Sequence, residues 1–397
     1  LEYRPHFTGG LRRLSQGVVF PNGFQGHAAT ETCPGHSTIL TGARPSRTGV
    51  IGNGWFDLGL SRSDKAVYCS EDPRVPDSSS SSYTVSPHFL RVPAMGDYMR
   101  RQLPGARSVA VAGKDRAAVM MGGQAPDQRW WWERDRFVSH AGVAPTAGVA
   151  AVNTNVAAAL ARPQEALALP AVCEAKARDV QVEGGGRAVG AGRFARDAGD
   201  RTRFRASPEA DGAVLALAAA LRQEMRLGEG AATDLLAIGL SASDYVGHTY
   251  GTQGSEMCIQ LMELDRSLGA FFDLLDRTGL DYLVMLTADH GGHDIPERHR
   301  QHAITEAARV DAALDAAAMD QRLRTQFGLS ERVLYGDFVG GDIYIARTLP
   351  AARRRQVTEA ALAAYRAHPQ VAAVFTREEI AATPSPAGPP EEWTLLQ

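Results

Sequence analysis

Three short, uninterrupted apolar runs constrain the fold of this chain more than any other feature. They span residues 108–112 (SVAVA), 235–240 (LLAIGL) and 282–287 (YLVMLT). Apolar runs of four to eight residues that end at polar or turn-forming residues are typical of strands buried on both faces. A sheet built from such strands needs a layer of helices on each face, because neither face can be left to solvent.

Segments with apolar residues at helical spacing alternate with these runs. We expect helices at five segments: 95–103, 146–161, 211–225, 255–275 and 351–366. Strands that alternate with helices predict an α/β fold with a mainly parallel sheet and helices on both faces.

The length of 397 residues fits one large α/β domain or two smaller ones, and we expect a single domain across residues 1–397. Within it, residues 122–210 differ in character, with a tryptophan triplet at 130–132 and a loose stretch rich in Gly and Arg at 184–205. We interpret 122–210 as a cap or insertion over the core. The triplet is expected to pack in the interior, and the alternative is a substrate-facing aromatic group.

The composition excludes several classes of partner. With 44% hydrophobic residues, 22% charged residues and a net charge of −3, the chain has the composition of an ordinary soluble globular protein. The near-neutral charge gives no reason to expect nucleic acid or an anionic membrane as a partner. No run of about 18 apolar residues exists in the sequence, so no membrane-spanning helix is expected.

The chain has four cysteines and no CxxC pair, which disfavours a cysteine zinc site. Cys258 falls in a helical pattern and is expected to be a core residue. Cys69 and Cys173 lie in loop-like stretches and could form a disulfide in an exported protein, the alternative being two unlinked thiols.

Polar side chains follow each of the three apolar runs. In chain order the pairs are Lys114 and Arg116, Asp244 and His248, and Asp289 and His290. In open α/β sheets, ligands bind outside the carboxyl ends of the strands. Three such pairs in one chain therefore predict a functional site at this edge of the sheet.

The two Asp–His pairs, 244/248 and 289/290, have the chemistry of metal ligands. Carboxylate and imidazole groups suit zinc, and two pairs suggest two ions. Two ions roughly 3.5–4 Å apart clamp the attacking and leaving oxygens of an in-line displacement.

The segment 27–53 supplies a candidate nucleophile. It is rich in hydroxyl groups, Gly and Pro, and we expect a loop around Thr32 with a helix behind it. A threonine hydroxyl is a weak nucleophile at neutral pH, and a bound metal ion makes it an alkoxide. Lys114, Arg116 and an amide such as Asn53 would supply positive charge and hydrogen-bond donors for phosphoryl oxygens.

Each of these features also has an ordinary structural explanation. Either Asp–His pair could be a surface pair, a helix cap or a plain turn after a strand, and the two cations could be solvated charges. Thr32 could cap a helix. His36, one turn past Thr32, is expected to be structural and not a ligand. The combination of all these features in one chain favours the functional interpretation.

The segment Thr32–Gly42 (TCPGHSTILTG), followed by residues 49–53 (GVIGN), resembles the nucleophile segment of the alkaline phosphatase superfamily. Within it, the chain is similar to the branch of nucleotide pyrophosphatases/phosphodiesterases and phosphate-irrepressible, PafA-type alkaline phosphatases. The Lys-x-Arg sequence at 114–116 resembles the pair that marks the monoesterase side of that branch. The D-x-x-x-H sequence at 244–248 and the D-H sequence at 289–290 resemble its zinc-ligand motifs.

The resemblance implies that Thr32 forms a covalent phosphothreonine, which a zinc-bound water hydrolyses. It implies that Asp244 and His248 hold one zinc ion, on the leaving-group and water side. It implies that Asp289 and His290 hold a second zinc ion, which activates the nucleophile.

By the same resemblance, Asn53, Lys114 and Arg116 bind the non-bridging oxygens of a small-molecule phosphate ester. The leading hypothesis is a phosphate monoester hydrolase, because a doubly charged terminal group rewards two cations. One alternative is a phosphodiesterase or nucleotide pyrophosphatase with the same two-metal site. A second alternative is a non-catalytic metal- or phosphate-binding protein. The oligomeric state is not predicted.

Two departures from the family pattern concern the metal ligands. The family has a further Asp ligand upstream of the nucleophile, whereas Glu2 and Glu31 are the only acidic residues before Thr32. It also has a third His ligand near the C-terminus, whereas the only His after His302 is His368, outside any matching motif. We therefore expect a fragment that lacks both ends, binds zinc weakly and is inactive. The family implies a periplasmic or secreted location.

Overall fold

A computed structural model describes residues 2–21, 23–336, 341–384 and 386–388. Its centre is a four-stranded sheet in the order β5–β4–β3–β8. The strands are β3 (Ser108–Ala112), β4 (Gln128–Glu133), β5 (Arg136–Val138) and β8 (Leu235–Gly239). Strand β3 pairs in parallel with both β4 and β8, and β5 is antiparallel to β4. The predicted α/β fold with a mainly parallel sheet is confirmed.

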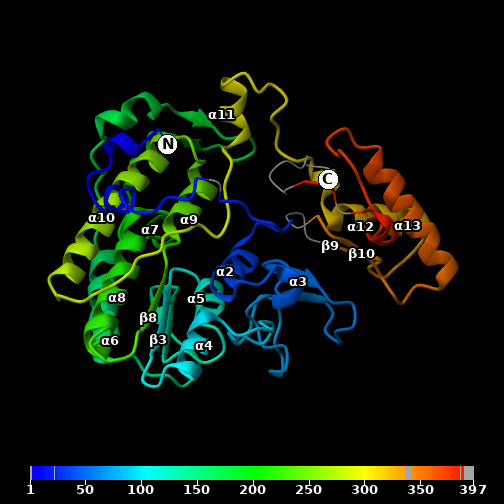
Figure 1. Cartoon of the computed structure of the whole chain (residues 1–397). Helices are drawn as coiled ribbons and strands as arrows, with labels where there is room; N and C mark the ends of the chain where they lie inside the picture. The colour runs from blue at the N-terminus through cyan, green and yellow to red at the C-terminus, as the bar shows by residue number, and fades with distance from the viewer. Residues whose placement is uncertain (1, 22, 337–340, 385, 389–397) are drawn as a thin grey trace.

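Helices cover both faces of this sheet (Figure 1). One layer contains α6 (Ala147–Leu160), α8 (Pro208–Met225) and α10 (Ser255–Asp276), and the other contains α2 (Thr32–Thr41), α4 (Met95–Gln102) and α5 (Asp115–Gly122). Successive side chains of β3 point to opposite faces. Val109 and Val111 enter the core under the first layer, and the smaller Ala110 and Ala112 face α5.

The tryptophan triplet packs in the interior, as predicted. Trp130 and Trp131 are 0% and 3% exposed and lie in the cores on opposite faces of β4. Trp132 packs against Phe137 and Phe204, with ring centres 5.3 Å apart in both pairs.

The segment 122–210, which we expected as a cap over the core, contributes β4, β5 and α6 to the core itself. Its later part, 161–207, consists of short elements outside the central sheet. The division into a single domain with a cap stays a prediction.

The C-terminal part has a core of its own. It contains α12 (Ala316–Phe327), α13 (Ala351–Arg366), α14 (Arg377–Ala382) and the antiparallel pair β9 (Leu334–Gly336) and β10 (Ile343–Ile345). Leu323, Leu334 and Val357 are fully buried in this core. These elements lie to one side of the central sheet (Figure 1).

The remaining elements are short and connect or cover these layers. They are η1 (Arg4–His6), α1 (Gly10–Leu14), α3 (Pro45–Thr48), β1 (Gly54–Phe56), β2 (Ala66–Tyr68), η2 (Ala171–Lys176), β6 (Val180–Gln181), β7 (Ala188–Val189), α7 (Arg201–Arg205), α9 (Ala242–Tyr250), α11 (Pro296–Gln301) and η3 (Ala312–Leu314). None of the helices in the described ranges combines the length and the apolar character needed to cross a bilayer.

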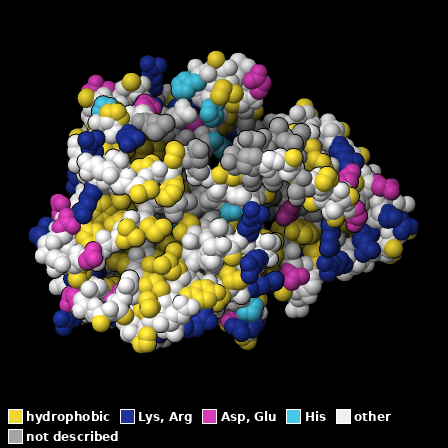
Figure 2. Space-filling model, viewed as in Figure 1, with side chains coloured by type: hydrophobic (Ala, Val, Ile, Leu, Met, Phe, Trp, Pro, Cys, Tyr) yellow, Lys and Arg dark blue, Asp and Glu magenta, His cyan; other side chains and the backbone are white. Residues whose placement is uncertain are grey.

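The predicted strand at 282–287 is absent from the described sheets. Side chains do alternate there as in a strand, since Val284 packs on the main core while Leu283 and Met285 are 87% and 86% exposed. Figure 2 shows hydrophobic side chains gathered on this face of the molecule. The prediction was wrong because an apolar pattern specifies alternation, whereas a strand also needs a partner for its backbone hydrogen bonds.

Two disulfides join the four cysteines, so both alternatives for Cys69 and Cys173, a bond between them or two unlinked thiols, are wrong. Cys33 on α2 is bonded to Cys69, which follows β2, and Cys173 on η2 is bonded to Cys258 on α10. Packing brings the segments that carry the bonded cysteines together, and their positions in the sequence do not reveal this. Cys258 is a fully buried core residue, as expected.

Asp211 of α8 is a buried carboxyl group that supports the start of α9. Its side chain is 3% exposed and accepts hydrogen bonds from the Ala242 N–H and from Gln260 Nε2, both at 2.9 Å. Burial raises the pKa of this carboxyl to about 6. The folded protein therefore binds this proton more tightly than the unfolded chain does.

The raised pKa of Asp211 predicts a pH-dependent loss of stability. The stabilising contribution is present below the unfolded pKa, near 4, and is lost as the pH rises to about 6, by ~3 kcal/mol at ~1.4 kcal/mol per pKa unit. The free energy of unfolding of the wild type, measured in urea, should fall by that amount relative to that of Asp211→Asn as the pH rises from 4 to 7. The exposed Asp281→Asn serves as the control. An equal pH dependence for Asp211→Asn and the wild type would contradict the prediction.

Candidate active site

Thr32 is the first residue of helix α2 and is only 2% exposed. Glu31 is at the N-cap position, so the Thr32 hydroxyl does not cap this helix. The hydroxyl faces the ammonium of Lys114, with Nζ 3.5 Å from Oγ1. We expected a loop around Thr32, but the helix begins there, because Pro34 is well tolerated in a first helical turn.

Gly35 allows helix α2 to approach the segment that carries Asp289. A Cβ atom at position 35 would lie 2.1 Å from the backbone oxygen of Asp289, so any side chain would force the two apart. One residue later, His36 Nδ1 lies 3.1 Å from Asp289 Oδ2 and 2.9 Å from the Thr32 carbonyl oxygen. His36 thus connects the nucleophile helix to a predicted zinc ligand, in keeping with a structural role.

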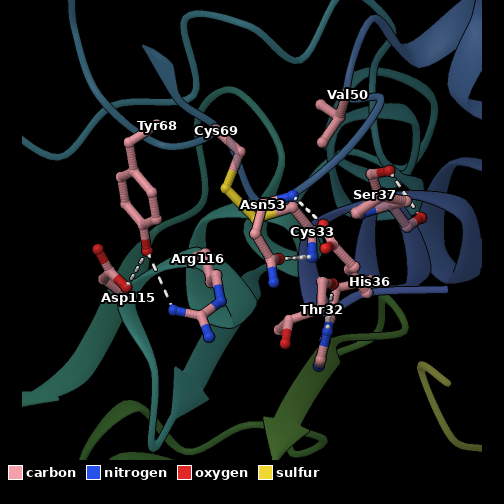
Figure 3. The surroundings of a disulfide bond; sticks show 12 residues. Thr32, Cys33, His36, Ser37, Val50, Asn53, Tyr68, Cys69, Asp115 and Arg116 are labelled. Atoms are coloured by element: carbon pink, nitrogen blue, oxygen red, sulfur yellow. Dashed lines mark hydrogen bonds between the residues drawn. A yellow bond between two sulfur atoms is a disulfide. The ribbon is translucent and has the colours of Figure 1, made fainter. Parts of the chain in front are cut away.

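Asn53 lies beside the N-terminus of α2 (Figure 3). Its Oδ1 accepts a 2.8 Å hydrogen bond from the Cys33 N–H, and its backbone N–H donates to Glu31 Oε2 at 2.5 Å. The Asn53 Nδ2 group has no protein partner within the described ranges. It is therefore available to donate hydrogen bonds to a ligand.

Lys114 and Arg116 follow β3, with Lys114 at the N-cap position of α5. Lys114 is 5% exposed, and its Nζ lies 2.5 Å from Asp244 Oδ2 and 4.8 Å from the centre of the Tyr245 ring. Burial lowers the pKa of Lys114, and the charge of Arg116 adds to this effect, whereas Asp244 opposes it. The guanidinium of Arg116 donates from NH1 to the Tyr68 hydroxyl at 3.3 Å (Figure 3).

The two predicted Asp–His pairs meet in one cluster. Asp244 Oδ1 lies 3.4 Å from His248 Nε2, one turn further along α9. The same oxygen lies 3.4 Å from His290 Nε2, which is 3.5 Å from Asp289 Oδ2. The structure thus brings all four predicted ligands together with Lys114, which also contacts Thr32 of helix α2.

These groups fit zinc in donor type and spacing, but they are few. Two atoms bound to one zinc ion at about 2.0–2.1 Å lie roughly 3.3 Å apart in tetrahedral geometry. The imidazole–carboxylate separations within the two pairs, 3.4 Å for Asp244 and His248 and 3.5 Å for Asp289 and His290, are close to this value. No group of three or more His, Cys, Asp or Glu residues in the described part of the chain forms a candidate metal site. Each predicted ion therefore has two protein donors from its own pair.

The carboxylates of the cluster are held in their ionised form. Burial alone would raise the pKa of Asp244, but hydrogen bonds with His248 and Lys114 hold it well below its usual range. Burial would likewise raise the pKa of Asp289, and the hydrogen bond with His36 lowers it below its usual value. The hydrogen bond with Asp244 raises the pKa of His248. The site therefore combines two carboxylates with buried positive charge.

Sequence reasoning missed the aromatic residues around the two cations. The Tyr245 ring lies between Lys114 Nζ and the guanidinium of Arg205, which is 4.6 Å from the ring centre. The hydroxyls of Tyr68 and Tyr83 both donate to Asp115. Only their positions in the sequence could have indicated them. Asp115 stands between Lys114 and Arg116, and Tyr245 directly follows Asp244.

Comparisons with known proteins agree with this geometry. The profile of the family described as type I phosphodiesterase / nucleotide pyrophosphatase matches residues 2–393. Alkaline phosphatase PhoK of Sphingomonas sp is 56% identical over 399 residues, which cover 100% of this chain and 71% of that protein. Alkaline phosphatase PhoD of Zymomonas mobilis subsp. mobilis is 43% identical over 401 residues, covering 100% of this chain and 69% of that protein.

A solved structure agrees in fold. The crystal structure of wild-type alkaline phosphatase PafA matches with a TM-score of 0.81 at 25% identity, covering 97% of this chain and 77% of that one. The family resemblance read from the sequence motifs is confirmed. The chain belongs to the type I phosphodiesterase/nucleotide pyrophosphatase family, in its branch of PafA-type alkaline phosphatases, and is a phosphoesterase.

Proposed function

We propose that this phosphoesterase hydrolyses phosphate monoesters at a two-zinc site, with Thr32 as the nucleophile and a covalent phosphothreonine as the intermediate. The observation that carries the proposal is the position of Lys114. Its Nζ lies 3.5 Å from Thr32 Oγ1 and 2.5 Å from Asp244 Oδ2, so one buried cation contacts both a nucleophile and a metal ligand. The relatives named alkaline phosphatases support the same activity.

In this proposal, Asp244 and His248 hold one zinc ion, and Asp289 and His290 hold the other. Bound zinc would supply Lewis-acid chemistry, lowering the pKa of an oxygen nucleophile and neutralising phosphoryl charge. His36 orients Asp289 through their 3.1 Å contact, the usual way in which a neighbouring group fixes a ligating carboxylate.

The chain itself prepares Thr32 for attack. Thr32 begins helix α2, where the helix dipole favours negative charge. Its burial excludes bulk water and strengthens the influence of Lys114. Attack by Thr32 Oγ1 on phosphorus forms one P–O bond as the bond to the leaving oxygen breaks, and overall the proton of the Thr32 hydroxyl passes to that oxygen to give the free alcohol. Water then displaces Thr32 from phosphorus and releases inorganic phosphate.

The charge of the site favours monoesters. Lys114 and Arg116 supply two cations, and Asn53 Nδ2 supplies a neutral donor, which together match a dianionic phosphoryl group. A diester presents a single negative charge and a second organic group. A phosphodiesterase or nucleotide pyrophosphatase remains the second candidate, because the matching family carries that description.

We also infer that the protein works in an oxidising compartment, in the periplasm or outside the cell. Both pairs of cysteines, Cys33–Cys69 and Cys173–Cys258, form disulfides. Disulfides persist in exported proteins and are rare in the reducing cytosol.

The test of the reaction compares kcat/KM of the protein for p-nitrophenyl phosphate and bis-p-nitrophenyl phosphate. We expect a preference for the monoester of at least about tenfold, because a hydrogen bond to a charged group contributes ~1.5–3 kcal/mol. Thr32→Ala should remove both monoester turnover and the phosphothreonine adduct detected by mass spectrometry after acid quenching. A preference for the diester would overturn the proposal.

Removing both cations tests whether they recognise the substrate's charge. We expect Lys114→Ala/Arg116→Ala to lower kcat/KM for the monoester by about 10²–10³-fold or more, and for the diester by about tenfold. The control is Arg353→Ala/Arg354→Ala, which removes two exposed cations of α13 and should change neither value. Equal losses on both substrates would show that the pair does not discriminate by charge.

Zinc content tests the ligand assignment. We expect the 397-residue chain to hold fewer than two zinc ions per molecule, because the described residues supply each ion with two donors and a closed site uses about four. His248→Ala and His290→Ala should each lower the content measured by atomic spectroscopy, whereas the exposed His6→Ala should not. Two ions at full occupancy with normal turnover of p-nitrophenyl phosphate would contradict this expectation.

A further inference from the structure

We propose that Tyr68 is a positioning residue for Arg116: its hydroxyl fixes the guanidinium, and Asp115 and Tyr83 hold Tyr68 in place. The proposal rests on the proposed function, in which Arg116 binds a phosphoryl oxygen. Hydrogen bonds link the four side chains involved, Arg116 to Tyr68, Tyr68 to Asp115 and Tyr83 to Asp115.

Arg116 has little else to orient it. Its only hydrogen bond in the described part of the protein runs from NH1 to the Tyr68 hydroxyl at 3.3 Å, and its buried Nε has no partner. No carboxylate in those ranges forms an ion pair with it. A guanidinium on a flexible side chain needs a fixed acceptor to stay in one place. Tyr68 supplies that acceptor.

The directions of the hydrogen bonds follow from the chemistry of the groups. A phenol has one O–H to donate, and the Tyr68 hydroxyl donates it to Asp115 Oδ1 at 2.8 Å. The lone pairs of the same oxygen therefore face the Arg116 N–H. Tyr83 donates its own hydroxyl to Asp115 Oδ2 at 2.9 Å, so both carboxylate oxygens accept from a phenol.

This arrangement keeps Arg116 available for substrate. Asp115 and Arg116 are adjacent on α5, and neighbours in a helix do not face each other. Had Asp115 bound the guanidinium directly, it would have neutralised the charge and occupied the fork that binds two oxygens. With Tyr68 in between, the carboxylate fixes the position of Arg116 through a neutral oxygen, and the other N–H groups stay free.

The phenol is itself fixed relative to the nucleophile. Tyr68 ends strand β2 and is followed by Cys69, whose disulfide partner Cys33 directly follows Thr32 (Figure 3). Asn53 also connects the two segments that carry Cys33 and Cys69. Its carbonyl oxygen accepts a hydrogen bond from the Cys69 N–H at 3.0 Å, and its Oδ1 accepts one from the Cys33 N–H. The Tyr68 hydroxyl and Thr32 are thus parts of one cross-linked unit.

Packing and protonation keep the hydroxyl in its role. The rings of Tyr68 and Tyr83 lie with their centres 4.5 Å apart. Burial raises the pKa of Tyr68 to about 12, and the charge of Asp115 adds to this, so the phenol stays protonated in alkaline solution.

A double-mutant cycle on the full-length protein tests the proposal. We expect Tyr68→Phe to lower kcat/KM for p-nitrophenyl phosphate by about 10- to 100-fold, in the range of a lost hydrogen bond to a charged group. In an Arg116→Ala background, the same substitution should change kcat/KM by less than about twofold, because the phenol acts through Arg116. Equal effects in the two backgrounds would overturn the proposal.

Two matched variants separate positioning from a general loss of structure. Tyr83→Phe also removes a phenol donor from Asp115 but does not contact Arg116, so it should cost less than Tyr68→Phe. Asp115→Asn preserves the shape of the carboxylate and removes its charge, and should show the same dependence on Arg116. If Tyr68→Phe does not fold, the cycle is run with Asp115→Asn in its place. Additive effects of Asp115→Asn and Arg116→Ala on kcat/KM would then overturn the proposal.

The inhibition constant for inorganic phosphate distinguishes this proposal from the proposed function. This constant is measured for the wild type, Tyr68→Phe, Arg116→Ala and the double variant. Either ester can serve as the substrate. A preference of the wild type for the diester would refute the monoesterase, while non-additive weakening of phosphate binding would still support the role of Tyr68. Additive weakening would refute the role of Tyr68 even in an active monoesterase.

Discussion

The buried ion pair between Lys114 and Asp244 is the interaction on which the site depends. Lys114 follows β3 and Asp244 lies in the helix that follows β8, so the pair joins the carboxyl ends of two neighbouring parallel strands. An unpaired buried charge costs several kcal/mol, and burial already lowers the pKa of Lys114. Each charge therefore needs the other. The position of Lys114 beside Thr32 then depends on the register of the β3–β8 ladder.

This dependence explains what could be predicted from sequence. The runs predicted as strands at 108–112 and 235–240 form β3 (Ser108–Ala112) and β8 (Leu235–Gly239), because each is apolar enough to be buried on both faces and is followed by polar residues. Parallel strands bring their carboxyl ends to the same edge of a sheet. The convergence of Lys114, Asp244 and His248 follows from local patterns alone, without knowledge of any long-range contact.

Contacts between distant segments were not predictable in this way. Four cysteines allow three pairings, and sequence position did not distinguish the Cys33–Cys69 bond from a bond between Cys69 and Cys173. The partner of Arg116 is a phenol 48 residues away on a short hairpin, and nothing in its sequence marks it as polar support for a cation. A strand likewise depends on a partner. The segment 282–287 has the alternation of a strand but no ladder in the described part of the protein.

The absence of a ladder at 282–287 divides the site into two halves that are held by different means. Lys114 and Asp244 follow paired strands, whereas Asp289 follows a segment whose Leu283 and Met285 remain in solvent. Each of those side chains forgoes the ~1.5–3 kcal/mol that full burial provides. What fixes Asp289 is helix α2, through the close approach at Gly35 and the contact with His36. Helix α2 thus positions the residue that is proposed to hold the zinc ion activating Thr32, and this half of the site should open more readily than the half anchored on the sheet.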